Sequence, residues 1–317
     1  MLKKLALLVI VLTTSSPVSA FGTINTLGQH AEHERITKSA LRSLGFGSKT
    51  LSELAGKRGT FGAVGAPDNP LRGLISKPFA HCDGGDTLNI PGYPQSKMAA
   101  AEKLNQCRKW IFRHLNNAIR YAGTVADKHG RIDNSQIPTF LPCVFNGKKG
   151  RAKCNVLDSL GVAFHAAQDF YSHTNWTDRA ANKSVGPSNP PGLGRSGRAP
   201  WLDPRLRKRM PHGLISGCFE GIPEHRYCTY DGDKLRVRHK VLNKDKGLID
   251  IRTGRAKVAR SSRGKIRGNF SRAVEAAIAD TSDKWSYFEE RIKSTYGSRR
   301  ARAIVCAIKS DNPKNCR

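Results

Sequence analysis

Two histidines and an aspartate stand four residues apart in an apolar stretch near the middle of the chain. His165, Asp169 and His173 lie within residues 160–176, LGVAFHAAQDFYSHTNW. In a helix, positions i, i+4 and i+8 share one face, so we expect these side chains to point the same way. Imidazole and carboxylate are zinc ligands, and charged groups in apolar surroundings are stable only when paired or ligated. The spacing therefore predicts a helical metal site; the alternative is a hydrogen-bonded buried histidine beside a solvated acid.

The segment HAAQDFYSHTNW resembles the signature of the secreted zinc-dependent phospholipase C and fungal heterokaryon-incompatibility C group. That group belongs to the superfamily of trinuclear-zinc phospholipases C and single-strand nucleases. Residues 30–41, 65–81 and 239–245 support the resemblance, which therefore spans most of the chain. It implies an all-α, single-domain helical bundle with long loops that holds two to three Zn²⁺ ions and hydrolyses phosphodiesters.

The resemblance implies metal ligands close to the N-terminus. In the superfamily the first residue of the mature chain donates its amine and carbonyl to one zinc ion, which points to Phe21 here. The group often has Trp at that position, but backbone ligands do not need an indole ring. His33 matches the histidine that follows shortly downstream, with His30 as second choice. The alternative places both histidines on the exposed side of an amphipathic helix.

Two further pairs complete the implied site. Asp68, within GAPDNP, and His81 match a loop pair in which both residues bind zinc and the aspartate is often the base; a surface Asx turn at Asp68 is the alternative. His239 matches the histidine of a second helical pair. The relatives carry Glu four residues later, whereas this chain has Asn243, so we assign the carboxylate to Asp245, because neutral amides bind zinc poorly.

The implied ligand set is too large for one tetrahedral zinc ion and suits two or three ions bridged by carboxylates. Its members are Phe21, His33, Asp68, His81, His165, Asp169, His173, His239 and Asp245. Grouped zinc ions lower the pKa of bound water and neutralise phosphate charge. We therefore expect in-line attack of a zinc-bound hydroxide on phosphorus, with Asp68 as the catalytic base or water-orienting group.

The first twenty residues have the pattern of a secretory signal peptide. Lys3 and Lys4 precede an apolar run, and the small residues 18–20 suit cleavage. Cleavage after Ala20 would leave residues 21–317 as one phosphodiesterase domain that is secreted or periplasmic. Residues 177–204 follow the metal helix and are rich in Gly, Pro and Ser, so we expect a flexible lid loop there.

Eight cysteines, an even number in an exported chain, predict a disulfide framework. The spacing suggests that neighbours pair, as Cys82–Cys107, Cys143–Cys154, Cys218–Cys228 and Cys306–Cys316. A cysteine-ligated zinc site is the rival interpretation, but the sequence contains no C-x2-C pair.

Helical periodicity predicts three long helices besides the central one, over residues 30–44, 96–126 and 270–296. His114 lies on the apolar face of the second, where we expect an interior histidine with satisfied hydrogen bonds. Asp158 lies seven residues before His165 and near the expected start of the central helix. It either orients that imidazole or caps the helix, and we favour the first.

The chain is strongly basic, with 54 Lys and Arg against 25 Asp and Glu and a formal charge of +29. Such a chain is attracted to polyanions, here a phospholipid membrane surface or nucleic acid. Three functions follow. A phospholipase C that releases the phosphorylated headgroup is favoured by the signature. A single-strand nuclease of the same superfamily fits the charge, but few residues are aromatic. A non-catalytic basic protein that binds surfaces and uses zinc structurally is the third.

Overall fold

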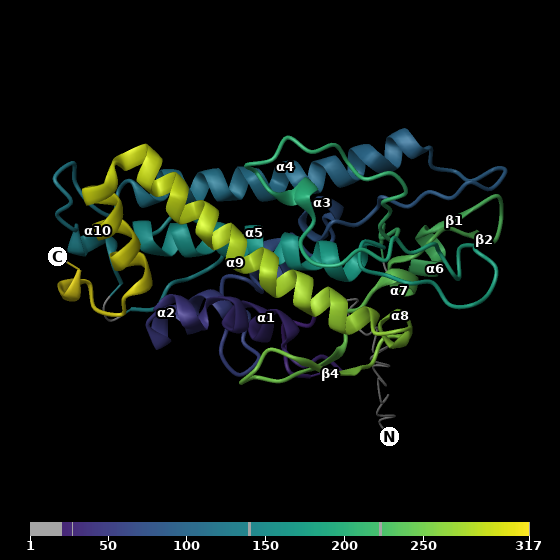
Figure 1. The fold of residues 1–317 in the computed structure, drawn as a ribbon, viewed down its shortest axis with the longest axis horizontal. Helices are drawn as coiled ribbons and strands as arrows, with labels where there is room; N and C mark the ends of the chain where they lie inside the picture. Colours follow the sequence, from purple (N-terminus) through teal and green to yellow (C-terminus); the bar gives the residue numbers. More distant parts are fainter. Residues whose placement is uncertain (1–20, 27, 139–140, 222–223, 317) are drawn as a thin grey trace, which may run out of the picture.

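The computed structural model describes residues 21–26, 28–138, 141–221 and 224–316 of the chain, and the expected signal peptide, residues 1–20, lies outside them. The described part is largely helical (Figure 1). Its α-helices are α1 (Glu32–Leu41), α2 (Ser48–Ala55), α3 (Pro78–His81), α4 (Lys97–Ala122), α5 (Ala152–His173), α6 (Glu224–Tyr227), α7 (His239–Leu242), α8 (Ser262–Lys265), α9 (Asn269–Tyr296) and α10 (Ser298–Lys309).

The expectation of an all-α fold needs one correction, because two small antiparallel sheets accompany the helices. Each has two strands: β1 (Thr229–Tyr230) pairs with β2 (Lys234–Leu235), and β3 (Gly247–Ile249) pairs with β4 (Ala256–Ala259). Strands of two to four residues carry too little alternation to be recognised in a sequence. The coarser prediction, a mainly helical fold, is confirmed.

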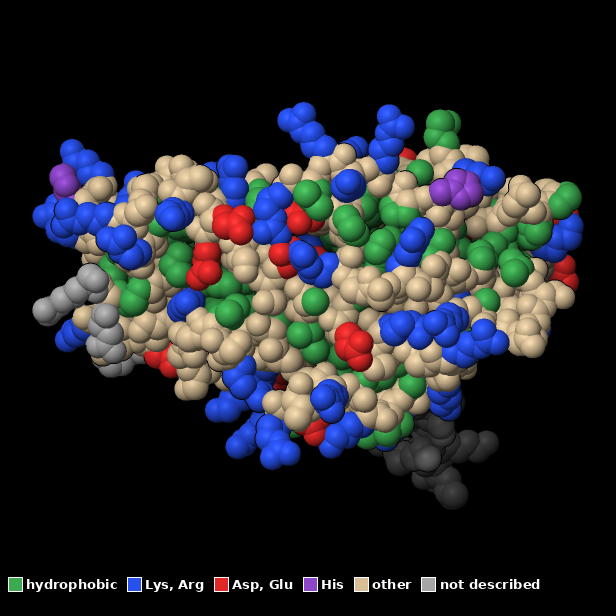
Figure 2. All heavy atoms as spheres, viewed as in Figure 1, with side chains coloured by type: hydrophobic (Ala, Val, Ile, Leu, Met, Phe, Trp, Pro, Cys, Tyr) green, Lys and Arg blue, Asp and Glu red, His purple; other side chains and the backbone are tan. Residues whose placement is uncertain are grey.

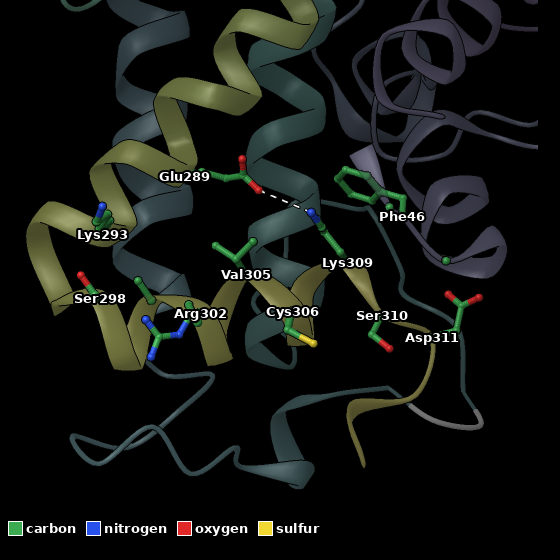
Figure 3. A pocket seen from close by; sticks show the side chains of 13 residues that line it. Phe46, Glu289, Lys293, Ser298, Arg302, Val305, Cys306, Lys309, Ser310 and Asp311 are labelled. Atoms are coloured by element: carbon green, nitrogen blue, oxygen red, sulfur yellow. Dashed lines mark ion pairs between the residues drawn. The ribbon is translucent and has the colours of Figure 1, made fainter. Parts of the chain in front are cut away.

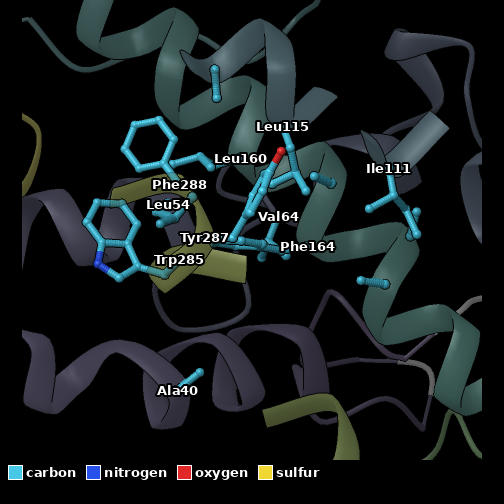
Figure 4. Packing of buried hydrophobic residues seen from close by; sticks show 14 of the residues in the cluster. Ala40, Leu54, Val64, Ile111, Leu115, Leu160, Phe164, Trp285, Tyr287 and Phe288 are labelled. Atoms are coloured by element: carbon cyan, nitrogen blue, oxygen red, sulfur yellow. The ribbon is translucent and has the colours of Figure 1, made fainter. Parts of the chain in front are cut away.

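Helix α5 runs through the middle of the molecule. It packs against α4 on one side and α9 on the other, while α1 lies along α9 (Figure 1). Its middle contributes Leu160 and Phe164 to a hydrophobic core that also contains Leu115 of α4 and Phe288 of α9 (Figure 4). Because neighbours cover it all round, almost every residue of α5 is buried.

Gly161 allows the backbone of Ala63 to lie close against α5. A Cβ atom at this position would lie 2.4 Å from the backbone carbon of Ala63, which is closer than real Cβ contacts. Any side chain would therefore push the 63–64 segment away from the helix. The next residue of that segment, Val64, contacts His165 in the second half of the helix through its backbone carbonyl.

Asp158 plays neither of the two expected roles. Helix α5 begins at Ala152, six residues earlier, so Asp158 does not cap it. Its carboxylate instead accepts hydrogen bonds from both Nη atoms of Arg72, which comes from the 3-10 turn η3 (Pro70–Arg72). His165 is oriented by another group. Asp158 therefore pairs with an arginine from a distant loop and contacts neither the helix start nor His165.

The four expected neighbouring cysteine pairs all lie at disulfide distance, with Cα–Cα separations of 5.0–5.9 Å. Four disulfides indicate an oxidising, extracellular type of compartment. Among the described residues, no helix combines the length and the apolar character that crossing a bilayer requires.

The segment 177–204, expected to be a flexible lid, is fastened to the body at several points. Asp178 is fully buried and paired with Lys244 and Arg263, at 2.9 and 2.7 Å. Towards its other end, Trp201 and Leu202 are buried in the main core. A lid function for the stretch between these anchors stays a prediction.

Candidate metal centre

The second half of α5 presents the three chemistry-bearing residues of the signature to one place. His165, Asp169 and His173 are all buried, and the Asp169 carboxylate lies at the centre of the cluster. Its Oδ2 atom is 3.0 Å from His165 Nε2 and 3.0 Å from His81 Nδ1. Its Oδ1 atom is 3.2 Å from His33 Nε2 and 4.0 Å from His173 Nε2. One carboxylate thus faces four imidazoles, as a bridging ligand would.

The other predicted side chains reach this cluster from separate elements. His33 lies in the first turn of α1, Asp68 ends the 3-10 turn η2 (Ala66–Asp68), and His81 ends α3. His239 begins α7, and Asp245 follows that helix. All five are at least nine-tenths buried. The structure therefore brings together all eight side chains that the sequence nominated as ligands.

Three buried groups in this cluster could hold a metal ion, each with ligand atoms within 4.8 Å of one another. They are His33, His165 and Asp169; Asp68, His81 and His165; and Asp83, His173 and His239.

The second group has nearly tetrahedral spacing. His81 Nδ1 and His165 Nε2 lie 3.0 Å apart and are each 3.0 Å from Asp169 Oδ2. Asp68 Oδ1 is 3.8 Å from the first nitrogen and 3.7 Å from the second. Ligand bonds of 2.0–2.2 Å in a tetrahedral zinc site place the ligand atoms about 3.3–3.6 Å apart. Five of the six separations, 3.0–3.8 Å, bracket that range, so small shifts of these four donor atoms would accommodate one zinc ion.

Three imidazoles are oriented by a hydrogen bond from one ring nitrogen to a backbone carbonyl, while the other ring nitrogen faces Asp169 or Asp245. His165 Nδ1 lies 2.9 Å from Val64 O, and His173 Nδ1 lies 2.8 Å from His81 O. His81 Nε2 lies 3.2 Å from Leu74 O. A carbonyl oxygen can only accept, so each of these nitrogens donates and the other ring nitrogen keeps its lone pair. This arrangement is typical of metal-binding histidines.

His33 is held in the same way by a side chain. Its Nδ1 atom lies 2.6 Å from Gln168 Oε1, and the Gln168 amide nitrogen donates to the hydroxyls of Thr37 and Thr281. The amide can accept only through its oxygen, so it fixes the proton of His33 on Nδ1. Nε2 of His33 then points its lone pair at Asp169.

Several buried polar atoms at the cluster have no hydrogen-bond partner: His33 Nε2, Asp83 Oδ1, Asp169 Oδ1, both ring nitrogens of His239, and Asp245 Oδ2. A buried polar atom without a partner costs about 1–3 kcal/mol, so a concentration of them needs an explanation. All are nitrogen or oxygen atoms of the kinds that bind divalent cations. The residues present therefore fit a metal centre.

The charges point to the same conclusion. Burial alone would lower the pKa of an imidazole, but neighbouring carboxylates raise the pKa values of His33, His81 and His173, and raise that of His239 to about 10. Burial also disfavours a charged Asp169, yet the surrounding histidines hold its pKa well below the usual range. Positive charge beside these carboxylates is therefore favourable, and a divalent cation would supply it in place of protons on the histidines.

Phe21 lies beside the cluster, as the sequence predicts. Its ring is fully buried and meets the His33 ring edge-on, with centroids 5.9 Å apart. The next residue, Gly22, donates its N–H to Asp245 O and accepts from His33 N, both at 3.2 Å. Residues 21 and 22 are therefore held between two candidate ligands, His33 and Asp245. Coordination by the Phe21 amine stays a prediction.

Three functional residues were missed by sequence reasoning. Asp83 Oδ1 lies 3.4 Å from His173 Nδ1, and Glu224 Oε1 lies 3.5 Å from His239 Nδ1. Gln168 is the third. Asp83 follows His81 and Cys82 directly, and this dense local group of donors was a usable signal. Gln168 lies inside the signature itself, while nothing local marks Glu224.

The cavity at the centre is small. It is lined by Asp68, Ile75, His81, Asp83, His173, Phe219 and His239, and about 10 Å³ is open to a water-sized sphere. That is room for roughly one water-sized species. Of the described residues that line it, none belongs to the expected lid.

A much larger cavity, of about 860 Å³, lies elsewhere, between the 45–47 segment, α9 and α10 (Figure 3). Ser310 on its wall accepts a hydrogen bond from Lys153 at the start of α5, whereas the candidate ligands occupy the end of that helix. An α-helix of this length extends about 33 Å. Size alone therefore does not identify the site, and we place the candidate centre at the small cavity because its lining carries the chemistry.

Comparison of the chain with protein-family models, with curated proteins and with solved structures finds no match.

Proposed function

We propose that the protein is an exported zinc-dependent phosphodiester hydrolase of the phospholipase C type, which cleaves the glycerol-side phosphodiester of phospholipids. One observation carries the proposal: side chains of α1, η2, α3, α5 and α7, together with Asp245, form one buried cluster of nitrogen and oxygen donors around Asp169. The signature around His165 adds the expectation of two to three zinc ions and a phosphate ester as substrate.

The residues divide into holding and assisting roles. His81, His165 and Asp68 would hold one ion with Asp169, which would also bridge to an ion at His33. His173 and His239 would hold a further ion with the carboxylates of Asp83 and Asp245. Bound zinc lowers the pKa of water to near neutrality and offsets the charge on phosphate oxygens.

Asp68 is the candidate base. It is the most exposed of the clustered carboxylates, at 8%, and it lines the small cavity. Its Oδ2 atom accepts a hydrogen bond from the Thr23 hydroxyl, while Oδ1 faces His81 and His165. A carboxylate held at the open edge can accept the proton of the attacking water or orient that water towards phosphorus.

Net charge favours a second candidate, a single-strand nuclease or nucleotidase that uses the same centre. Lys and Arg side chains project around the outline of the view in Figure 2, whereas Asp and Glu are few there. A basic surface attracts nucleic acid as well as anionic lipid. The choice between the two therefore depends on the substrate.

The test measures bound metal and hydrolysis on the disulfide-bonded protein. We expect two to three zinc ions per chain and release of phosphocholine from phosphatidylcholine, both abolished by a chelator and restored by zinc. Faster cleavage of single-stranded DNA than of lipid would replace the first function by the second. Bound zinc without hydrolysis of either substrate would leave a non-catalytic surface-binding protein, and the absence of bound metal would refute all three.

A further inference from the structure

A large apolar side chain projects into solvent on the loop that carries Asp68. Leu71, three residues after the candidate base, is 92% exposed. It lies in the short turn η3, which Asn69 caps by accepting the N–H of Leu71. Exposed aliphatic side chains are ordinary when scattered singly but meaningful when grouped.

A second loop with exposed apolar residues is tied to the first. Leu141 and Val144 are 70% and 68% exposed. Arg72 donates to the carbonyl oxygen of Phe145 at 3.0 Å and also pairs with Asp158 of α5. Because its side chain is buried between them, Arg72 holds the two loops against the same part of the molecule.

Aromatic and basic side chains of α4 continue this surface. Trp110 is partly exposed and packs against Phe79 and His114, with ring centroids 4.7 and 4.3 Å apart. Arg113 covers the indole at 4.5 Å. A hollow of about 360 Å³ lies here, lined by Phe79, Gln106, Lys109, Trp110 and Arg113.

His114 connects the loops to this aromatic group. It was expected in the core, but it is only partly buried and its Nδ1 atom has no hydrogen-bond partner. Burial, together with the charges of Arg113 and Arg72, lowers its pKa to about 4. Arg72 of the loop and Arg113 of the helix therefore flank the same imidazole.

The surface is also rich in cations. Lys148 and Lys149 follow the Val144 loop, are exposed, and have no ion-pair partner among the residues that the structure describes. We call the whole surface the docking face and define it by Leu71, Trp110, Arg113, Leu141, Val144 and the pair Lys148–Lys149.

We propose that the docking face binds the anionic surface of a phospholipid bilayer and thereby brings the Asp68 side of the metal centre to lipid headgroups, a role that rests on the function proposed above. Leucine and valine enter the boundary of the acyl region, tryptophan favours the interface, and lysine and arginine bind lipid phosphate. Leu71 follows Asp68 by three residues, and Phe79, which packs against Trp110, belongs to α3 together with His81, so the face adjoins the elements that carry these two candidate ligands. A nucleic-acid surface would use several exposed stacking rings, whereas the most exposed apolar residues of this face are Leu71, Leu141 and Val144, and its one ring, Trp110, is partly buried.

Tryptophan fluorescence gives a direct test, because Trp176, Trp201 and Trp285 are buried and Trp110 is not. We expect vesicles of phosphatidylcholine with about one third phosphatidylglycerol to shift the emission to shorter wavelength, and Trp110→Phe to abolish the shift. Vesicles of phosphatidylcholine alone should bind more weakly, and salt should weaken the binding to anionic vesicles.

The double variant Leu71→Asp/Val144→Asp should lower vesicle partitioning at least about tenfold, because both apolar anchors are lost and two negative charges are added. The matched control is Ile251→Asp/Val258→Asp, two residues that are 60% and 46% exposed beyond the docking face on the β3–β4 hairpin. It should bind vesicles as the wild type does. Both variants should hydrolyse a small soluble phosphodiester at the wild-type rate.

Binding and hydrolysis separate the two proposals. Wild-type partitioning of Leu71→Asp/Val144→Asp would overturn the docking face and leave the hydrolase standing. Vesicle binding through this face without hydrolysis of any phosphodiester would support docking and refute the hydrolase. If the double variant instead loses binding of a single-stranded oligonucleotide while keeping vesicle binding, the face serves nucleic acid and the bilayer proposal is wrong.

Discussion

Both halves of α5 are buried and contribute apolar side chains to the core, but only the second half also presents candidate metal ligands. Val156, Leu157 and Leu160 in the first half meet aliphatic and aromatic side chains of α4 and α9. His165 and Asp169 in the second half meet imidazoles and carboxylates delivered by loops and helix ends. Burial of the first kind stabilises the fold without further help. Burial of the second kind is costly unless the charges are compensated, so the same helix is a core element at one end and a candidate ligand carrier at the other.

The largest difference between the halves should come from Asp169→Asn. The amide has nearly the same shape but cannot bridge cations, so we expect loss of at least one zinc ion and a fall in hydrolysis of at least about a thousandfold, equivalent to the several kcal/mol that a metal ion supplies. Metal analysis and phosphodiester hydrolysis check this.

The matched control is Asp280→Asn in α9, whose carboxylate is also buried but pairs with Lys284 at 2.6 Å. It leaves Lys284 unpaired and should cost about 3–5 kcal/mol of stability while the zinc content stays unchanged. Equal zinc loss in both variants would show that Asp169 acts through folding alone.

Leu157→Ala tests the apolar half. Leu157 is fully buried, so truncation should lower the free energy of unfolding by about 2–5 kcal/mol through lost burial and the cavity left behind. Zinc content per folded chain should not change, because the residue contacts the core rather than the centre. Urea denaturation with parallel metal analysis measures both, and a proportional loss of zinc would contradict the division between the halves.

Gln168→Met should weaken zinc binding by about 10–100-fold, the usual effect of removing the group that orients a ligand histidine. Gln168→Glu is the sharper partner variant, since it keeps an oxygen that accepts from His33 Nδ1. It should retain most of the zinc affinity. Competition with a chromogenic chelator gives both affinities, and equal loss in the two variants would contradict the role assigned to this hydrogen bond.

The smallest expected effect is a pH dependence of the metal-free protein. Carboxylates raise the pKa of His239 from 6.5 to about 10 against the opposing effect of burial. The stability this supplies is present below pH 6.5 and is lost as the pH rises towards 10. Thermal unfolding of chelated protein should therefore weaken over that window. Zinc-loaded protein should not follow it, because zinc-bound imidazoles carry no proton to lose; identical profiles would contradict the assignment.

Local patterns predicted the parts of the site that local geometry controls. His165, Asp169 and His173 share a face because of helical spacing, and neighbouring cysteines pair because their loops are short. Asp83 escaped prediction because its approach depends on distant backbone pairing, in which Gly84 N donates to Gly217 O and Ser216 N donates to Gly85 O.

Long-range contacts also explain the errors. Arg72 reaches Asp158 from a loop 86 residues away, so no local pattern around the helix start could reveal this ion pair. The convergence of His33, Asp68, His81 and His239 was proposed from resemblance alone. Spacing along the chain does not indicate which remote segments come into contact in the fold. The structure supplies that convergence.

Gly161 has a consequence that reaches beyond packing. Because position 161 has no side chain, the 63–64 segment can lie against α5. The backbone carbonyl of Val64 in that segment accepts from His165 Nδ1 and so keeps the proton of His165 on that nitrogen. A single methyl group at position 161, one helical turn before His165, would displace that carbonyl and leave the imidazole free to rotate. Gly161→Ala would then behave as a metal-binding defect, although the position holds no atom capable of touching a cation.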